Sequence, residues 1–349
     1  MPATNYISWF QDIGLDDRPQ VGGKGGSLGE LHRAGIPVPA GFVVRTESFE
    51  RFIEALERSS PLRSRVEQLP DDLPSIEAAS RELRARIEAA PLPEDLQQEI
   101  REAYARLGGA NSAPAVAVRS SATTEDSADA SFAGLQDTYL WVSRAEPLLD
   151  KIRSCWGSLY SPESLSYRRR LKIPESGVAM AVVVQTMVDA RTAGVMFTRS
   201  PLTGDKSVIT IEAAWGLGSA LVSGEVTPDR WVVGKITGEI SVRDISDKHL
   251  CHARSSAGGV EECAVEEPRR RAACLTDEEL QSLRAVGRQI ERHYGRPQDI
   301  EWAIDRHTQN ILLLQSRPET VWSNKDSAAA APRVDDPLLH VMKIFGGQR

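Results

Sequence analysis

Residues 298–318 read QDIEWAIDRHTQNILLLQSRP, and no other stretch of the chain says as much about its fold. Two runs, DIEWAID from Asp299 and NILLLQSRP from Asn310, flank a short polar turn, which predicts an antiparallel β-hairpin centred near residue 308. A hairpin centred there places Glu301 opposite Gln315 and, one pair further from the turn, Asp299 opposite Arg317. Because side chains two residues apart share a face of a strand, all four polar groups are predicted on one face.

This polar face predicts a site for a cation and for phosphate. Two carboxylates, an amide oxygen and a guanidinium are costly to bury together unless a ligand satisfies them. Magnesium takes oxygen ligands and commonly binds through one or two carboxylates plus nucleotide phosphates, while Arg317 can stabilise charge on a phosphoryl group in transfer. The alternative is a solvated polar face on an edge hairpin. The alternate residues of the hairpin form a predicted core face, which favours a hairpin packed on the protein core over a solvated edge hairpin. The residues of this core face are Trp302, Ile304, Leu312 and Leu314.

A glycine-rich segment, Val21-Gly-Gly-Lys24-Gly-Gly-Ser27, lies near the start of the chain. Glycines allow backbone N–H groups to approach phosphate oxygens, and the helical pattern that begins directly afterwards, at Ser27, favours anions at its N-terminus. Lys24 would add a positive charge. The segment does not fit the phosphate-loop pattern GxxxxGK[ST], so a plain turn is the alternative.

An arginine lies near the end of the apolar run 115–121, AVAVRSS, and small hydroxyl residues follow it. The guanidinium of Arg119 is a fork of donors that can hold phosphate oxygens in a bidentate manner, and the residues after it suit a lid loop. A salt bridge at the strand end with an ordinary turn is the alternative. The run 178–188, VAMAVVVQTMV, could pair its backbone with the edge of an adenine ring, although an ordinary core strand has the same pattern.

The composition of the 349 residues is that of a soluble globular protein, with 41% apolar and 26% charged residues. A net charge of −7 argues against a nucleic-acid partner, because contact with a phosphate backbone needs a basic face. No run approaches the roughly eighteen apolar residues of a membrane span. The N-terminus lacks a signal-peptide pattern, so we expect a cytoplasmic protein without membrane contact.

Cysteines and histidines are expected to take no part in catalysis or metal binding. The four cysteines lack CxxC spacing and are interpreted as reduced, and the six histidines show no metal-like spacing and are interpreted as surface or packing residues. They are Cys155, Cys251, Cys263 and Cys274, and His32, His249, His252, His293, His307 and His340.

The rest of the chain is predicted to combine helices with strands. Helices are expected over 47–57, within the Pro-bounded stretch 61–108, within 147–170 and over 277–294, and strands over 41–44, 193–199, 208–215, 230–235 and 239–243. A polar segment of low order is predicted over 253–272. Residues 322–337 have the composition of a linker, and a short amphipathic element, LLHVMKIF, follows it.

Four segments, taken in order, resemble the N-terminal nucleotide-binding region of the phosphoenolpyruvate synthase and pyruvate phosphate dikinase family. The resemblance covers residues from about 18 to 321 and is far more specific than any glycine-rich loop alone. The segments are VGGKGGSLGELHRAGIPVPAGFVV from Val21, AVRSSATTEDSADASFAGLQDTYL from Ala117, IEAAWGLGSALVSGEVTPDRWVV from Ile211, and GRPQDIEWAID with ILLLQSRPET from Gly295.

The resemblance implies an α+β protein with an ATP-grasp fold, in which ATP lies between two lobes. The first lobe would cover residues 1–200, with a helical insertion at about 60–110. The second would cover 201–321 and contain the hairpin, and residues 322–349 would form a linker and a docking tail. ATP and Mg²⁺ would be the cofactors.

The resemblance also implies roles for residues at matching positions. Those expected to contact ATP are Lys24 and Arg119 at its phosphates, Gly134 and Thr138 in the loop over the triphosphate, and Gln185 and Met187 at the adenine. Those expected at the hairpin are Glu301 and Gln315 as magnesium ligands, Asp299 beside them, and Arg317 on the phosphoryl group in transfer. Catalysis would rest on Arg317, Arg119 and Lys24.

Members of this family continue into a swivelling domain with a phosphohistidine loop, which is not visible in these 349 residues. We therefore expect the chain to pass a phosphoryl group from ATP to a histidine on a partner subunit or domain, giving AMP and phosphate overall. A small-molecule phosphoryl acceptor would be bound elsewhere. A split enzyme of the phenylphosphate synthase type, acting on phenol, has this organisation.

Two alternatives are open. The chain could be the N-terminal ATP-binding domain of a phosphoenolpyruvate synthase (pyruvate, water dikinase) or of a rifampin phosphotransferase. A non-catalytic nucleotide-sensing subunit is the alternative of another class. The intact set at the hairpin argues against that alternative, since a sensor would be free to lose it; the set is Asp299, Glu301, Gln315 and Arg317.

Overall fold

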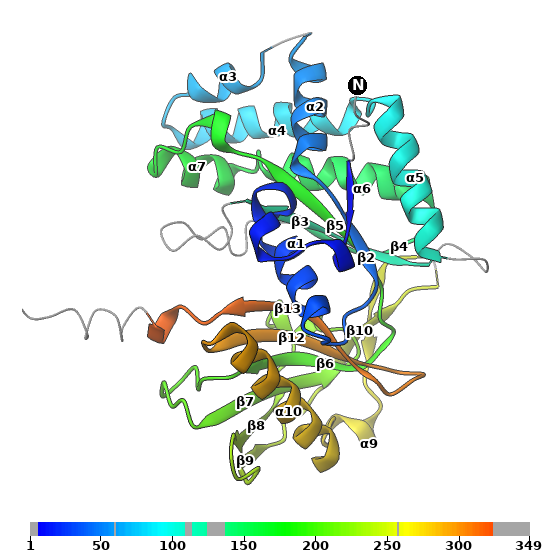
Figure 1. Cartoon of the computed structure of the whole chain (residues 1–349), viewed down its shortest axis with the longest axis vertical. Helices are drawn as coiled ribbons and strands as arrows, with labels where there is room; N and C mark the ends of the chain where they lie inside the picture. Colours follow the sequence, from blue (N-terminus) through cyan, green and yellow to red (C-terminus); the bar gives the residue numbers. More distant parts are fainter. Residues whose placement is uncertain (1–5, 59–60, 109–113, 124–136, 257, 324–349) are drawn as a thin grey trace, which may run out of the picture.

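The computed structural model describes residues 6–58, 61–108, 114–123, 137–256 and 258–323. Helices combine with two large antiparallel sheets, one in the upper and one in the lower half of Figure 1, which confirms the α+β class. Gly134 and the predicted tail beyond residue 323 lie outside the described residues. Within the described ranges, no helix is long and apolar enough to cross a membrane.

The first sheet has five strands in the order β1-β2-β5-β3-β4, and every neighbouring pair is antiparallel. Its inner strands are buried almost throughout because helices cover both faces, which explains why their sequences read as apolar runs without alternation. The strands are β1 (Ile7–Trp9), β2 (Gly41–Val44), β3 (Val116–Ala122), β4 (Thr138–Val142) and β5 (Met180–Thr186).

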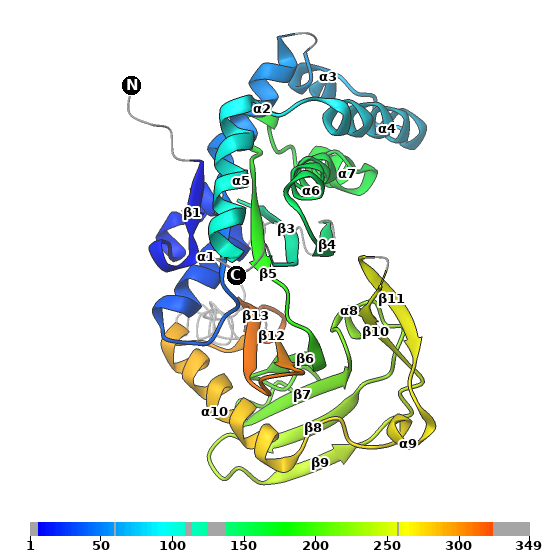
Figure 2. The same ribbon diagram turned by 90° about the vertical axis from the view of Figure 1, so that its right-hand side faces the viewer.

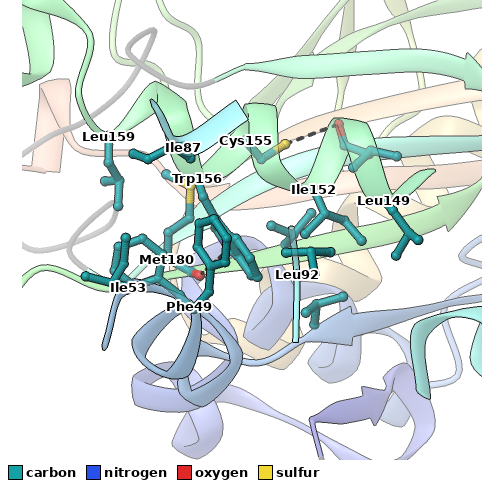
Figure 3. Close-up of a cluster of buried hydrophobic side chains, with 14 of the residues drawn as sticks. Phe49, Ile53, Ile87, Leu92, Leu149, Ile152, Cys155, Trp156, Leu159 and Met180 are labelled. Carbon is teal, nitrogen blue, oxygen red and sulfur yellow. Dashed lines mark hydrogen bonds between the residues drawn. The ribbon is translucent and has the colours of Figure 1, made fainter. Parts of the chain in front are cut away.

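A helical layer packs on one face of this sheet around the buried indole of Trp156 (Figure 3). The Trp156 ring lies against Phe49 and Phe52, with centroids 6.0 and 5.1 Å away, and its Nε1 donates to the Met180 carbonyl at 3.2 Å. Burial raises the pKa of the neighbouring Cys155 thiol, so that thiol is inert. The layer comprises α2 (Thr46–Glu57), α3 (Arg63–Glu67), α4 (Leu73–Ala89), α5 (Glu94–Gly108), α6 (Ala145–Ser158) and α7 (Pro162–Arg170).

The second sheet has six strands in the order β13-β12-β6-β7-β8-β9, again antiparallel throughout. Helix α10 (Asp277–Tyr294) packs on one face over the buried indoles of Trp231 and Trp302, and a Thr276 capping box starts it. The strands are β6 (Ala190–Phe197), β7 (Val208–Trp215), β8 (Asp229–Gly234), β9 (Ile240–Asp244), β12 (Gln298–Asp305) and β13 (Ile311–Pro318).

Helix α1 (Arg18–Arg33) joins the two sheets, as Figure 1 shows. It packs on the first sheet, while its Ser27 hydroxyl donates to the Ser316 carbonyl of β13 at 2.6 Å. The chain crosses to the second sheet between β5 and β6, ahead of the predicted boundary at residue 200. Short 3-10 turns lie at η1 (Phe10–Asp12), η2 (Leu15–Asp17) and η3 (Glu175–Gly177).

The prediction of low order over 253–272 is wrong. This part of the chain holds most of a two-stranded ribbon, β10 (Leu250–Arg254) with β11 (Val260–Ala264), and the short helix α9 (Glu267–Arg270). Strand pairing satisfies the backbone whatever the side chains are, so an exposed ribbon can be polar on both faces. Pairing also places Cys251 directly opposite Cys263, although both thiols are free, as are the other two cysteines.

Candidate functional site

A cavity of about 370 Å³ lies between the two sheets. The first sheet contributes the ends of β3, β4 and β5, and the second contributes β6, β12, β13 and the short helix α8 (Ser219–Val222). Most of the lining is apolar, with few polar groups, as in pockets for small organic ligands. The residues used below that line it are Arg119, Thr138, Gln185, Met187, Leu217, Ser219, Leu221, Val222, Glu301, Trp302 and Leu314.

The hairpin has the predicted register at its open end. Glu301 lies opposite Gln315, and Asp299 lies opposite Arg317. A β-bulge after Glu301 shifts the register, so that Trp302 pairs with Leu313.

The bulge makes part of the predicted core face wrong. Leu313, and not Leu312 or Leu314, joins Trp302 in the core under α10. Leu312 and Leu314 are half-buried on the opposite face, where Leu314 lines the cavity. An extra residue in one strand reverses the alternation beyond it, which a simple pairing rule does not foresee.

Arg119 joins the two sheets at one end of the cavity. From β3 it reaches the hairpin, where Nη1 donates to the Leu314 carbonyl at 2.8 Å. Nη2 donates to Gln315 Oε1 at 2.6 Å and to Glu301 Oε2 at 3.2 Å. The Arg119 residue is only 8% exposed, so its charge needs this carboxylate close by. Three predicted site residues that are far apart in the sequence therefore form one cluster.

Asp299 lies beside this cluster with an unsatisfied oxygen. Arg317 Nε lies 3.5 Å from Asp299 Oδ2, whereas Oδ1 is buried and has no hydrogen-bond partner. Burial raises the pKa of the Asp299 carboxyl, against the opposing effect of Arg317. An orphaned carboxylate oxygen next to Glu301 and the Gln315 amide fits a hard cation that takes oxygen ligands.

Within the described residues, no three His, Cys, Asp or Glu side chains gather as a metal site. A cation at the hairpin would therefore need the amide oxygen of Gln315 and further oxygens from its ligand. Magnesium binds in this way when it accompanies substrate phosphates, with few protein ligands of its own.

The end of β5 presents a second orphaned group. Gln185 is 2% exposed and lines the cavity, and its Nε2 has no hydrogen-bond partner. The backbone N–H groups of Thr186 and Met187 donate to the carbonyls of Ala40 and Ala115, at 2.8 and 2.9 Å. The side-chain amide of Gln185 is thus a donor still available to a ligand.

Two of the predicted site residues are not among the described residues that line the cavity. Thr138 lines it, whereas Lys24, on α1, and the half-exposed Arg317, on the hairpin, do not. The predicted turn followed by a helix from Ser27 is shifted in the structure, because α1 begins at Arg18 and is kinked at Gly22, with φ 70° and ψ 177°, so that its second helical part starts at Gly23.

Sequence reasoning missed several polar groups in the cavity wall, among them Ser219. The Ser219 hydroxyl lies 2.8 Å from Nδ1 of His252, and His252 Nε2 lies 3.2 Å from Glu225 Oε2. His293 and His307 do form the surface pairs expected of a histidine, with Glu30 and Asp189. No local spacing signals the Ser219–His252 contact, because strand β10 reaches α8 only through the fold.

An apolar cavity with an arginine, a carboxylate and an amide oxygen at one end has the chemistry of a nucleotide-binding domain. Residues 18–336 match the family model described as pyruvate phosphate dikinase, AMP/ATP-binding domain, and the chain belongs to this family.

Curated relatives include a phosphoenolpyruvate synthase of Aeropyrum pernix, 42% identical over 93% of this chain and 43% of the relative. A probable phosphoenolpyruvate synthase of Archaeoglobus fulgidus is 44% identical over 90% of the chain and 41% of the relative. A rifampicin phosphotransferase of a Streptomyces species is 40% identical over 97% of the chain and 38% of the relative. The chain thus spans less than half the length of these relatives.

Proposed function

We propose that this chain binds ATP with magnesium in the cavity between its two sheets, in the manner of an ATP-grasp fold, and passes a phosphoryl group on. The observation that carries the proposal is the contact of Arg119 with Glu301 and Gln315. A buried guanidinium and an oxygen pair at one end of an apolar cavity match a ligand with an anionic end and an aromatic end.

The two ends of the cavity suggest how ATP would lie. Adenine nitrogens accept hydrogen bonds, and the Nε2 group of Gln185 is a buried donor without a partner, so the base is placed there beside Met187. The phosphates are placed at Arg119 and Thr138, toward the hairpin. Lys24, on α1 and not among the cavity-lining residues, is the proposed further phosphate contact.

Glu301 and Gln315 would hold magnesium, with Asp299 beside them. Bound there, the ion would neutralise charge on the phosphates during transfer. Arg119 would leave these oxygens and turn to the phosphates, and Arg317 would stabilise the phosphoryl group in transfer.

A histidine outside this chain's cavity is the proposed acceptor of the phosphoryl group. None of the described residues that line the cavity is a histidine. A phosphohistidine domain or subunit would then pass the group to a small molecule. The names of the relatives favour the phosphoenolpyruvate synthase and rifampicin phosphotransferase types, and phenol, as in a phenylphosphate synthase, is the further candidate.

Calorimetric titration of ATP with and without Mg²⁺ tests the proposal. We expect binding that strengthens with Mg²⁺ in the wild type, and loss of that Mg²⁺ dependence in Glu301→Gln. The matched control is Glu261→Gln on the exposed ribbon, which should behave as the wild type. An ATP affinity of the wild type that is the same with and without Mg²⁺ would contradict the magnesium site.

A second measurement tests the need for a partner. The pure chain with Mg²⁺ and ATP should release AMP very slowly, because the proposed acceptor histidine is not in its cavity. Rapid, steady AMP release by the chain alone would overturn this part of the proposal while leaving ATP binding intact.

A further inference from the structure

One wall of the cavity combines apolar side chains with two hydroxyls, those of Ser219 and Ser223, and the Ser223 hydroxyl donates to the Ala220 carbonyl at 3.3 Å. Leu217, Leu221 and Val222 supply the apolar surface, and Ser219 lies among them. The Ser219 Oγ atom is 2.8 Å from His252 Nδ1, and the opposite ring nitrogen, Nε2, is 3.2 Å from Glu225 Oε2. Figure 2 shows the strand that carries His252, β10, beside α8.

Backbone contacts hold this strand against the wall. The Leu217 N–H donates to the His252 carbonyl at 2.9 Å. Gly216, at φ 74°, lies so close that an added Cβ would be 2.4 Å from the same carbonyl oxygen. Positive φ and this close approach both require glycine, so the juxtaposition of Ser219 and His252 is built into the fold.

The position of each proton follows from the chain of contacts. Hydrogen bonds from Ser223 and His252 hold the pKa of the Glu225 carboxyl below its usual range, so Glu225 is an ionised acceptor. In a neutral His252, we assign the ring proton to Nε2, which faces the Glu225 carboxylate, and Nδ1 is then an acceptor. The single proton of the Ser219 hydroxyl goes to Nδ1, and only the lone pairs of Oγ are left for the cavity.

We propose that Ser219 determines specificity by accepting a hydrogen bond from the nucleoside part of ATP, and that His252 and Glu225 are positioning residues that fix its proton. The donor is a ribose hydroxyl or the adenine amino group, since phosphates are acceptors and would repel this oxygen. This inference rests on the proposed function, because it assumes that ATP occupies the cavity.

Nucleotide analogues identify the donor. Affinities are measured for ATP, 2′-deoxy-ATP, 3′-deoxy-ATP and purine riboside triphosphate, which lacks the amino group. In the wild type, one analogue is expected to bind about 3- to 10-fold more weakly than ATP, the range of one hydrogen bond. In Ser219→Ala, the affinity for ATP should fall to the affinity for that analogue, so that the variant no longer distinguishes the two nucleotides.

Variants of the positioning residues separate this role from a structural one. His252→Ala should reduce the ratio between the affinity for ATP and the affinity for that analogue, because the Ser219 proton is no longer fixed. Thermal unfolding should show that the variant is folded. Two matched controls lie away from the cavity and should leave the ratio unchanged. They are Ser282→Ala on α10 and His293→Ala, whose ring pairs with Glu30.

Each outcome decides a different question. If the wild type binds no nucleotide, the proposed function fails and this inference with it. If ATP binds but all three analogues bind as tightly as ATP, the proposed function stands and the role of Ser219 is overturned. The same follows if Ser219→Ala keeps the wild-type ratio between the affinities for ATP and the analogue.

Discussion

The β12–β13 hairpin and the glycine-rich part of α1 are both predicted to bind phosphate, but the structure uses them differently. The hairpin directs Glu301 and Gln315 toward Arg119 at the end of the cavity. Two glycines of α1, Gly22 and Gly29, lie against neighbouring backbone instead. An added Cβ would lie 2.1 Å from the Ser121 carbonyl oxygen at Gly22 and 2.5 Å from the Ile13 carbonyl oxygen at Gly29.

This difference shows what a glycine-rich segment can and cannot indicate. Both a phosphate loop and a tightly packed helix need positions without a Cβ, so composition does not separate them. The two regions nevertheless depend on each other, because Ser27 of α1 donates to the Ser316 carbonyl of the hairpin. The hairpin offers side chains for chemistry, and α1 holds the sheets that bring those side chains together.

Arg317→Ala is expected to have the largest effect and tests the chemical role of the hairpin. Arg317 is half-exposed and lies outside the cavity lining, so ATP affinity should change only a few-fold. Phosphoryl transfer to a phosphohistidine partner should fall by about 10³, the lower range for an arginine that stabilises transferring phosphate. Phosphorylation rates measured with saturating ATP test this expectation.

The control for this variant is Arg306→Ala at the hairpin turn. Arg306 is similarly exposed and pairs with Asp189, away from the cluster. Its removal should leave transfer unchanged. Equal transfer rates in the two variants would show that the hairpin side chains have no special chemical role.

Gly22→Ala tests the structural role of α1. The variant combines backbone angles of φ 70° and ψ 177°, a region essentially restricted to glycine, with a Cβ 2.1 Å from a carbonyl oxygen, so we expect about 3 kcal/mol or more of lost stability. Gly35→Ala is a control with a similar φ, 69°, in which nothing lies within 4 Å of the added Cβ. It should cost only about 1 kcal/mol. Urea unfolding without nucleotide measures both, and equal losses would contradict the packing role.

The sequence allowed much of the hairpin to be predicted, because strand alternation is a local property. The pairing of Glu301 with Gln315 and of Asp299 with Arg317 follows from alternation alone. The bulge after Glu301 does not, because the four consecutive apolar residues 311–314 are compatible with either register of the core face. The predicted register was therefore correct for the polar pairs at the open end of the hairpin and wrong for Leu312 and Leu314.

Contacts between distant segments could not be predicted in this way. The approach of Arg119 to Gln315 depends on how two sheets face each other, and the approach of His252 to Ser219 depends on a ribbon whose polar sequence suggested low order. Both are tertiary effects without a local signal, so family resemblance could imply the first but not the second.

Arg119→Ala tests the contact between strand β3 and the hairpin through effects of opposite sign. ATP should bind about tenfold more weakly, because a charged hydrogen-bonding partner of the phosphates is lost. A divalent cation alone should bind more tightly than in the wild type, since Arg119 no longer occupies the oxygens of Glu301 and Gln315. Titration with Mn²⁺, followed by electron paramagnetic resonance, measures the second effect. Weaker binding of both ligands would show that Arg119 supports the cation site instead of competing for it.

Asp299→Asn is expected to have the smallest effect and compares the two ends of the hairpin. Burial raises the pKa of the Asp299 carboxyl, so wild-type stability falls as pH rises through that pKa. The variant should therefore unfold at a slightly higher temperature at neutral pH, with the difference shrinking toward pH 4.

Asp305 at the turn is the opposite case. Slight burial raises the pKa of its carboxyl, but hydrogen bonds from Thr308 and His307 lower that pKa overall, so Asp305→Asn should lose stability at neutral pH. If Asp299→Asn lowers the unfolding temperature at neutral pH, as Asp305→Asn does, burial does not destabilise the Asp299 carboxylate, and its unpartnered oxygen no longer supports a cation site.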